Sequence, residues 1–198
     1  MLLYHDIHND IEVGCDEAGR GCLAGPVIAS AVILPKTYHN PKIKDSKKLS
    51  SKERFIVRED ILTHCIAYGI GEVSHIEIDQ INILNASILA MHRALDQITQ
   101  SLDLILVDGN KFKPYKNLKH LCVIKGDDKY QSIAAASILA KTYRDELMAS
   151  YHKDYPMYSF DQNKGYPSKK HRDSITEFGI CPIHRMTFGQ NKRTLFNP

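Results

Sequence analysis

Apolar residues recur along the chain in two patterns, short runs and longer segments with helical spacing. Short apolar runs bounded by glycine or polar residues are typical of buried strands. On this basis we predict five strands, at residues 13–15, 27–34, 65–73, 104–107 and 121–124. The run at 27–34 contains a single polar residue, Ser30, which indicates a strand buried on both faces.

Helical spacing of apolar residues predicts four helices. The first follows Ser50, which we expect to cap it together with Glu53 three residues later, and it runs to about His64. The other three are predicted at residues 82–99, 134–148 and 168–178. After about residue 150 no strand is predicted, and aromatic and basic residues become frequent.

The order of these elements indicates an α/β protein in which helices cover a sheet. The first three strands are close enough in sequence for an antiparallel meander, and the helix before the fourth strand permits a parallel crossover. We divide the chain into a main domain over residues 1–150 and a small helical C-terminal extension over residues 151–198.

Composition excludes several classes of protein. The 198 residues are 43% hydrophobic and 25% charged, as in globular proteins, and no apolar run is long enough to span a bilayer. Residues 1–6 lack the pattern of a signal peptide, so the expected compartment is the cytoplasm. Five scattered cysteines without a CxxC pair predict neither a zinc knuckle nor a disulfide framework.

The net charge of +3 conceals an uneven distribution. Residues 36–58 hold eight basic residues against two acidic ones, and residues 151–198 hold eight against four. The rest of the chain is therefore acidic. Two basic segments around an acidic body are expected of a polyanion-binding face, but solvated surface lysines give the same pattern, and charge alone does not separate the two interpretations.

Carboxylates stand directly after two predicted strands. Asp16 and Glu17 follow the first, and Asp108 follows the fourth. If these strands are neighbours, Asp16 and Asp108 lie side by side, and a third acidic position, Asp127-Asp128, precedes a helix. Each alone is explained as a turn or a helix cap. Together they favour metal-dependent phosphoryl transfer, because clustered carboxylates repel unless a cation neutralises them, and oxygen ligands favour Mg²⁺ or Mn²⁺.

A glycine-rich segment follows the first pair of carboxylates. Gly19 and Gly21 allow the backbone to approach a ligand closely, and Arg20 between them adds a positive charge. Such a loop beside two acids suits a sugar-phosphate backbone. A tight strand-to-strand connection would explain the glycines but not Arg20.

The sequence of residues 16–27, DEAGRGCLAGPV, strongly resembles the signature of the type 2 ribonucleases H, in particular the bacterial ribonuclease HII family. Further blocks resemble the family in the same order, so the resemblance covers the chain from about Gly14 to Arg185. These blocks are residues 45–50, 107–109, 125–127, 134–141 with 144–145, 164–166 and 182–185.

The resemblance implies a ribonuclease H-like fold, with a five-stranded mixed sheet flanked by helices and a helical C-terminal part that completes the substrate-binding face. It implies a metal-dependent endonuclease that cuts the RNA strand of RNA–DNA hybrids and nicks 5′ of single ribonucleotides in duplex DNA, leaving a 3′-hydroxyl and a 5′-phosphate. Two Mg²⁺ or Mn²⁺ ions are expected with substrate. Their implied ligands, which are also the catalytic residues, are Asp16, Glu17, Asp108 and Asp127.

For the fourth carboxylate, Asp128 and Asp145 are alternatives; Asp127 is preferred because it follows Gly126, as in the family's Gly-Asp pair. By the same resemblance, the Gly19-Arg20-Gly21 motif contacts the ribose 2′-hydroxyl, and Tyr166 packs on the following deoxyribose. Further nucleic-acid contacts, either to phosphate groups or through support of the residues that touch the substrate, are assigned to Lys47, Lys48, Ser137, Lys141 and Arg144.

Two other functions compete with this one. Ribonuclease HIII cuts hybrids but handles isolated ribonucleotides poorly, and the Gly-Arg-Gly loop argues against it. A nucleic-acid-binding protein without catalysis would retain the basic segments but would not need the acids at the strand ends. The expected state is a monomer. Residues 194–196 after Gln190 faintly resemble a sliding-clamp-binding tail, although a frayed terminus is the favoured interpretation.

Overall fold

The structure is a computed structural model that describes residues 11–45 and 49–189 of the chain. Its centre is a five-stranded sheet with the order β3-β2-β1-β4-β5. The strands are β1 (Glu12–Ala18), β2 (Val27–Ile33), β3 (Ala67–Val73), β4 (Leu104–Asp108) and β5 (Lys119–Val123). β1, β2 and β3 form an antiparallel meander, whereas β4 is parallel to both β1 and β5. The predicted mixed sheet is therefore confirmed.

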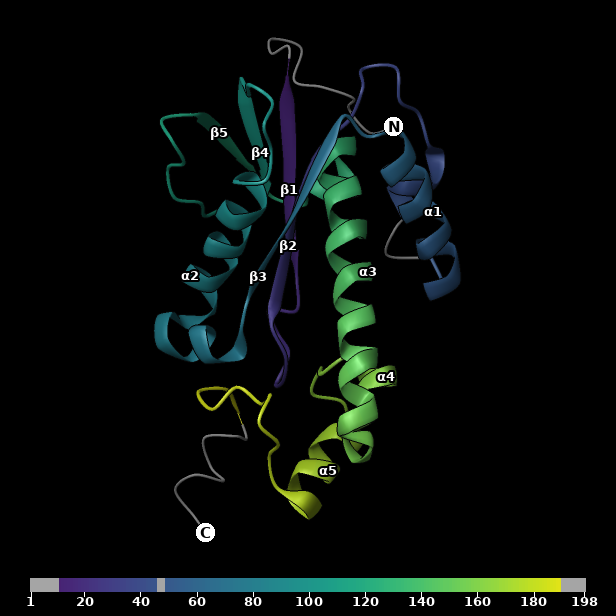
Figure 1. Cartoon of the computed structure of the whole chain (residues 1–198), viewed down its shortest axis with the longest axis vertical. Coiled ribbons are helices and arrows are strands. Elements are labelled where there is room, and N and C mark those ends of the chain that lie inside the picture. Colours follow the sequence, from purple (N-terminus) through teal and green to yellow (C-terminus); the bar gives the residue numbers. More distant parts are fainter. Residues whose placement is uncertain (1–10, 46–48, 190–198) are drawn as a thin grey trace.

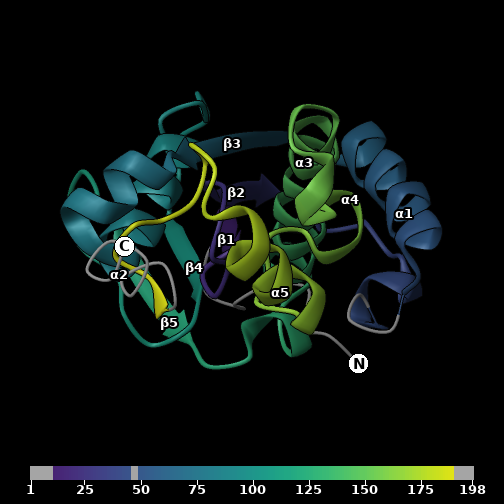
Figure 2. The ribbon, with the colours of Figure 1, turned by 90° about the horizontal axis from the view of Figure 1, so that it is seen from below.

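Helices cover both faces of this sheet (Figures 1 and 2). α2 (His75–Leu95) packs on one face, and α1 (Ser51–His64) and α3 (Gln131–Asp154) pack on the other. Two short helices, α4 (Phe160–Asn163) and α5 (Lys169–Phe178), follow α3. Three 3₁₀ helices complete the structure: η1 (Pro41–Asp45), η2 (Gly126–Asp128) and η3 (Pro156–Tyr158). In the part of the chain described here, no helix is long and apolar enough to cross a membrane.

The first strand is longer than its apolar run predicts. The run ends at Cys15, but β1 continues to Ala18 and includes Asp16 and Glu17. The prediction that these carboxylates follow the strand is wrong for a physical reason. Pairing with β4 ends at Cys15, whereas pairing with β2 continues to Ala18 and keeps the backbone extended.

Two helices also differ from their predicted bounds. α1 begins as expected, because Ser50 and Glu53 form a reciprocal capping box. α2 begins at His75 rather than at residue 82, and its backbone breaks at Asn82, where φ is 66°. The Asn82 side chain accepts hydrogen bonds from the amides of Leu84 and Asn85, so it caps the second helical segment, which is the part that the apolar spacing predicts.

α3 lies unusually close to β1 because Gly14 has no side chain. A Cβ atom at this position would lie 2.2 Å from the carbonyl carbon of Ser132, in the first turn of α3. This close approach brings α3 against the strand that carries Asp16. The same helix runs without interruption past residue 150, and α4 and α5 pack around Met148 and Phe160 near its C-terminal end.

Candidate active site

The sheet brings two of the predicted carboxylates together. The paired register of the parallel strands β1 and β4 ends at Cys15 and Val107. Asp16 and Asp108 are the next residue on each strand, and each influences the other electrostatically. The point where the pairing of β1 with β4 ends thus places the two carboxylates side by side, as the sequence predicts.

Asp16 is a buried carboxyl group whose pKa is strongly raised. Its side chain is buried, with 5% of the residue exposed, and one oxygen accepts a 2.7 Å hydrogen bond from the Glu17 amide. Burial, followed by the charges of Glu17 and Asp108, raises the pKa of Asp16 to about 8. Burial also raises the pKa of Glu17, and Arg20 opposes that change. Asp16 therefore favours its protonated form at neutral pH when no cation is bound.

Asp108 and Asp127 approach the site through one short turn. An Asp108 side-chain oxygen accepts a 2.7 Å hydrogen bond from the amide of Gly126, and Asp127 follows in η2. Asp127 is buried and Asp128 is exposed. Asp145 lies on α3 and pairs with Arg54 at 3.5 Å. Asp127 is buried and follows the turn that contacts Asp108. These two features favour Asp127 over Asp128 and Asp145 as the fourth carboxylate of the site.

These carboxylates suit a hard divalent cation in their chemistry. They offer only oxygen donors, they are largely buried, and their mutual repulsion at Asp16 is the kind that a bound cation relieves. Within residues 11–45 and 49–189, no three Asp, Glu, His or Cys side chains are already close enough together to hold a metal ion.

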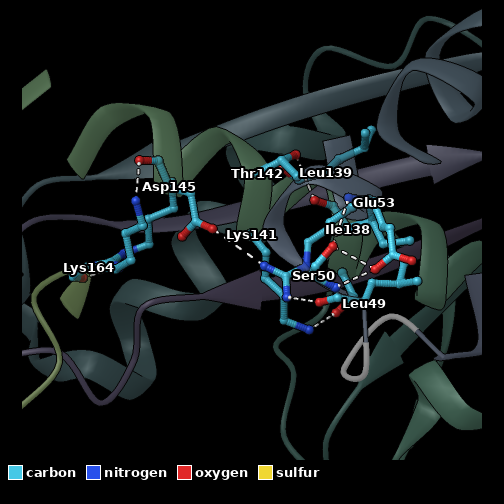
Figure 3. Close-up of polar contacts among 12 residues, drawn as sticks. Leu49, Ser50, Glu53, Ile138, Leu139, Lys141, Thr142, Asp145 and Lys164 are labelled. Carbon is cyan, nitrogen blue, oxygen red and sulfur yellow. Dashed lines mark hydrogen bonds and ion pairs between the residues drawn. The ribbon is translucent and has the colours of Figure 1, made fainter. Parts of the chain in front are cut away.

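Two polar residues of α3, Ser137 and Lys141, interact with Asp16. Lys141 donates a hydrogen bond to the Ser137 hydroxyl, one helical turn before it. Both groups lower the pKa of Asp16, the lysine by its charge and the serine by a hydrogen bond, against the stronger effect of burial. Figure 3 shows Lys141 on α3. Ser137 and Lys141 thus support the carboxylate from α3.

The Gly19-Arg20-Gly21 loop lies beside the carboxylates. Arg20 donates a 3.0 Å hydrogen bond to Glu17, and half of its side chain remains exposed. Gly19 has a φ of +96°, and a Cβ atom there would lie 2.1 Å from Nε of Arg144. This conformation is strained for any residue except glycine. A cleft of about 200 Å³ adjoins the loop and is lined by Glu17, Arg20, Leu84, Ser87, Ile88, Met91, Asp108, Gly109, Asn110 and Lys111.

Arg144 is buried behind the Gly19–Gly21 loop. It is 2% exposed, and all three of its nitrogens donate to backbone carbonyl groups, those of Ala24, Pro26 and Lys164, at 2.7–3.1 Å. Three of the five N–H groups of this guanidinium therefore bind backbone carbonyl groups, and the side chain is almost fully buried. In this structure Arg144 holds the backbone of residues 24–26 and 164 in place, which fits the supporting role of the two predicted for it; a phosphate contact stays a prediction.

Arg185 has a similar role that the sequence interpretation missed. It is fully buried, and it donates to the carbonyl groups of Gly19, Arg20, Gly25 and Pro26 at 2.8–3.1 Å. The only feature of the sequence that draws attention to Arg185 is its place in the family-like block at residues 182–185. Burial of an arginine depends on distant segments, so this signal does not reveal the role.

Tyr166 lies next to the same loop, although it is 145 residues away from Gly21 in the sequence. A Cβ atom on Gly21 would lie 3.9 Å from the Tyr166 ring, and Tyr166 is 48% exposed. The backbone joins the two segments, since the Leu23 amide donates to the Gly165 carbonyl at 2.8 Å. Tyr166 is thus available to a ligand that reaches the Gly19–Gly21 loop.

Two remaining predictions concern parts of the chain without a described structure. Lys47 and Lys48 lie outside the described residues, as does the clamp-like segment at 194–196. A further lysine, Lys164, contacts the backbone of α3. Lys164 and Asp145 lie together beside α3 in Figure 3, where Nζ of Lys164 donates to the Asp145 carbonyl at 3.5 Å. In the sequence, Lys164 stands in the family-like block at residues 164–166.

A family model described as ribonuclease HII matches residues 13–191. The chain is 55% identical over 189 residues to the ribonuclease HII of Porphyromonas gingivalis, covering 95% of this chain and 94% of that protein. It is 57% identical over 188 residues to the ribonuclease HII of Bacteroides thetaiotaomicron, with the same two coverages.

Solved structures share the fold. The ribonuclease H2 of Pyrococcus horikoshii OT3 has a TM-score of 0.77 and 25% identity, and the match covers 93% of this chain and 97% of that one. The ribonuclease HIII named Bst-RNase HIII, solved in complex with Mn²⁺, has a TM-score of 0.67 and 17% identity. That match covers 94% of this chain and 69% of the other, and at this identity it bears on the fold alone.

Proposed function

The chain belongs to the ribonuclease HII family and is a ribonuclease H endonuclease, and we propose that it hydrolyses the RNA strand of RNA–DNA hybrids and nicks 5′ of single ribonucleotides in duplex DNA. The observation that carries the proposal is the position of the Gly19–Gly21 loop. It lies between the carboxylates of β1 and the half-exposed ring of Tyr166. A binding protein without catalysis is excluded by membership of an enzyme family.

We assign the metal ligands to Asp16, Glu17, Asp108 and Asp127, with Mg²⁺ or Mn²⁺ as the ions. Such ions would activate a water molecule and stabilise the leaving oxygen. In the reaction, the water oxygen bonds to the phosphorus on the 5′ side of the ribonucleotide, and the bond from phosphorus to the preceding 3′ oxygen breaks. The products carry a 3′-hydroxyl and a 5′-phosphate.

The chain's other residues would bind and orient the substrate. The backbone of Gly19 and Gly21 and the exposed part of Arg20 would contact the ribose 2′-hydroxyl, and the Tyr166 ring would pack on the next sugar. Ser137 and Lys141 would hold Asp16, and Lys47 and Lys48 would bind phosphate groups. The C-terminal extension, residues 151–198, would complete this face, since it supplies Tyr166. All these groups come from one chain, so we propose a monomer.

The experiment that tests this function compares three substrates: a DNA duplex with one ribonucleotide, an RNA–DNA hybrid and an all-DNA duplex. We expect metal-dependent cleavage of the first two, with the first nicked once on the 5′ side of the ribonucleotide. The end groups are read by ligation of the 3′-hydroxyl and by phosphatase sensitivity of the 5′ end. Cleavage of the hybrid alone would favour a ribonuclease HIII-like specificity and overturn the proposal.

Replacing Arg20 by alanine should reduce cleavage of the single-ribonucleotide duplex by about 10- to 100-fold, because a charged contact to substrate is lost. The change in unfolding free energy should be small, about 0.5 kcal/mol, since the side chain is half exposed and its ion pair is at the surface. Activity assays and thermal unfolding measure the two effects. A variant that loses stability and activity in parallel would point to a purely structural role.

Replacing Tyr166 by alanine should reduce the preference for a single ribonucleotide over a hybrid by roughly tenfold, because an aromatic surface for the sugar is removed. Tyr166→Phe is the matched control. It keeps the ring and loses only the hydroxyl, so its preference should stay close to that of the wild type. The ratio of kcat/KM on the two substrates is the measurement. An unchanged ratio in the alanine variant would remove Tyr166 from substrate recognition.

A further inference from the structure

Two histidines lie in the core of the C-terminal extension, and the proposed function gives them no role. His171 is on α5, and His184 is in the segment that follows it. Their residues are 0% and 1% exposed, and their Nε2 atoms are 3.1 Å apart. The rings of Tyr158 and Phe160 pack against them, with centroids 4.9 Å from His184 and 5.3 Å from His171, respectively. The two imidazoles therefore form a hydrogen bond inside an aromatic cluster.

The hydrogen-bond network assigns the protons of both rings. Nδ1 of His171 lies 2.9 Å from the carbonyl oxygen of Tyr166, which only accepts, so this nitrogen carries a proton. In a neutral ring Nε2 of His171 then accepts, and Nε2 of His184 donates to it. Nδ1 of His184 in turn accepts from the Cys181 amide at 2.9 Å, and the sulfur and the carbonyl oxygen of Cys181 lie 3.1 and 3.2 Å from the same nitrogen. Every ring nitrogen is satisfied when both rings are neutral.

Burial keeps the pair in this state. It lowers the pKa of His171, and burial followed by the nearby His171 lowers the pKa of His184 to about 4. At neutral pH both rings are therefore uncharged, and the direction of each hydrogen bond is set by the backbone groups at the two ends.

The two ends of this network belong to the two elements that the proposed function uses for recognition. One end is the backbone of Tyr166. At the other end, His184 pairs with Ala24 through a backbone bridge and directly precedes Arg185, which holds the carbonyl groups of Gly19 and Arg20. The hydrogen bond between the histidines thus connects Tyr166 with the Gly19–Gly21 loop from the buried side.

We propose that His171 and His184 are positioning residues that hold Tyr166 in register with the Gly19–Gly21 loop, so that selectivity for an isolated ribonucleotide depends on their mutual hydrogen bond. Neither ring touches the substrate face, because both are buried. The inference rests on the proposed function and adds to it the residues that set the relative position of the two recognition elements.

A matched pair of substitutions at His184 separates positioning from stability. His184→Gln places an amide nitrogen near the position of Nε2, so it still donates to His171 and loses the acceptor for the Cys181 amide. His184→Asn places an amide oxygen near the position of Nδ1, so it still accepts from Cys181 and loses the donor to His171. Both variants lose one buried hydrogen bond, and only the asparagine variant breaks the bond between the two side chains.

The measurement is the ratio of kcat/KM for the single-ribonucleotide duplex to kcat/KM for the hybrid, together with the melting temperature of each variant. We expect H184N to lower the ratio about tenfold and H184Q to keep it within about twofold of the wild type, as expected when a supporting residue loses its orienting bond. Tyr158→Phe is the stability control, since it removes a 2.9 Å hydrogen bond to the Gly179 carbonyl in the same cluster. It should lower the melting temperature without changing the ratio.

Equal ratios for H184N and H184Q would overturn the inference, as would a changed ratio in Tyr158→Phe. If H184N does not fold, His171→Asn is the alternative, because it breaks the bond between the two histidines and keeps a donor for the Tyr166 carbonyl. A wild-type ratio in His171→Asn would also overturn the inference. A wild-type enzyme that leaves the single-ribonucleotide duplex intact would overturn the proposed function and this inference together. Cleavage by the wild type with unchanged ratios in the variants would overturn this inference alone.

Discussion

Replacing Asp16 by asparagine is expected to reduce cleavage by roughly 10²- to 10³-fold or more. Asp16 is the buried carboxylate that β1 places beside Asp108, and the loss of one charged ligand weakens the stabilisation of charge at the transition state. Steady-state assays with saturating Mg²⁺ or Mn²⁺ measure the effect. A normal rate in D16N would contradict the assignment of the site.

The same substitution should stabilise the metal-free protein, and the effect should depend on pH. Since the folded-state pKa of Asp16 is raised to about 8 from an ordinary 3.8, the folded state binds a proton that the unfolded state has released. Stability of the wild type therefore falls as the pH rises from about 4 to about 8. D16N lacks this penalty, so in EDTA its melting temperature should exceed that of the wild type by about 5 °C at pH 8.

The control for this prediction is Asp128→Asn. Asp128 is adjacent to Asp127 but exposed, so its loss should leave both the rate and the pH dependence of stability close to those of the wild type. Asp127→Asn should lose activity as D16N does. A severe loss of activity in D128N with a normal rate in D127N would show that Asp128, and not Asp127, is the fourth carboxylate of the site. A stability difference between D16N and the wild type that is the same at pH 5 and pH 8 would show that ionisation of the buried Asp16 is not its cause.

Replacing Arg185 by methionine should cost about 3–5 kcal/mol of unfolding free energy, which lowers the melting temperature by about 10 °C. The apolar part of the side chain is kept, but the carbonyl groups of Gly19, Arg20, Gly25 and Pro26 lose a buried charged donor. Arg185→Lys should recover little, because one ammonium group cannot replace the three guanidinium nitrogens that bind carbonyl groups on different sides.

Thermal and denaturant unfolding measure this loss, and cleavage at a temperature where the variant is folded measures its effect on the loop. Arg172→Met is the matched control, since Arg172 lies in the same extension but is exposed. It should change stability by less than about 1 kcal/mol. Equal effects of the two substitutions would mean that the buried hydrogen bonds of Arg185 contribute little to the fold.

Much of the fold follows from local patterns in the sequence. The strands and α1 could be predicted because apolar runs and the Ser50–Glu53 capping box act over a few residues. The position of Asp16 next to Asp108 followed from the ends of two apolar runs and the short connections between elements. By contrast, the first turn of α3 is buried against β1 at Gly14, so its helical spacing is hidden among buried residues and the predicted helix began too late.

The sequence by itself determined the sheet, the carboxylates at its edge, and the motifs that resemble the ribonuclease HII family. Only the tertiary structure decided what the arginines and histidines do. All four residues, Arg144, Arg185, His171 and His184, have polar side chains like those of a binding surface, and all four are buried. The two arginines bind carbonyl groups of residues 19–26, far away in the chain, whereas the rings around the two histidines come from the same C-terminal extension. Whether a guanidinium faces a phosphate or a backbone carbonyl depends on those distant contacts, and local sequence patterns carry no information about them.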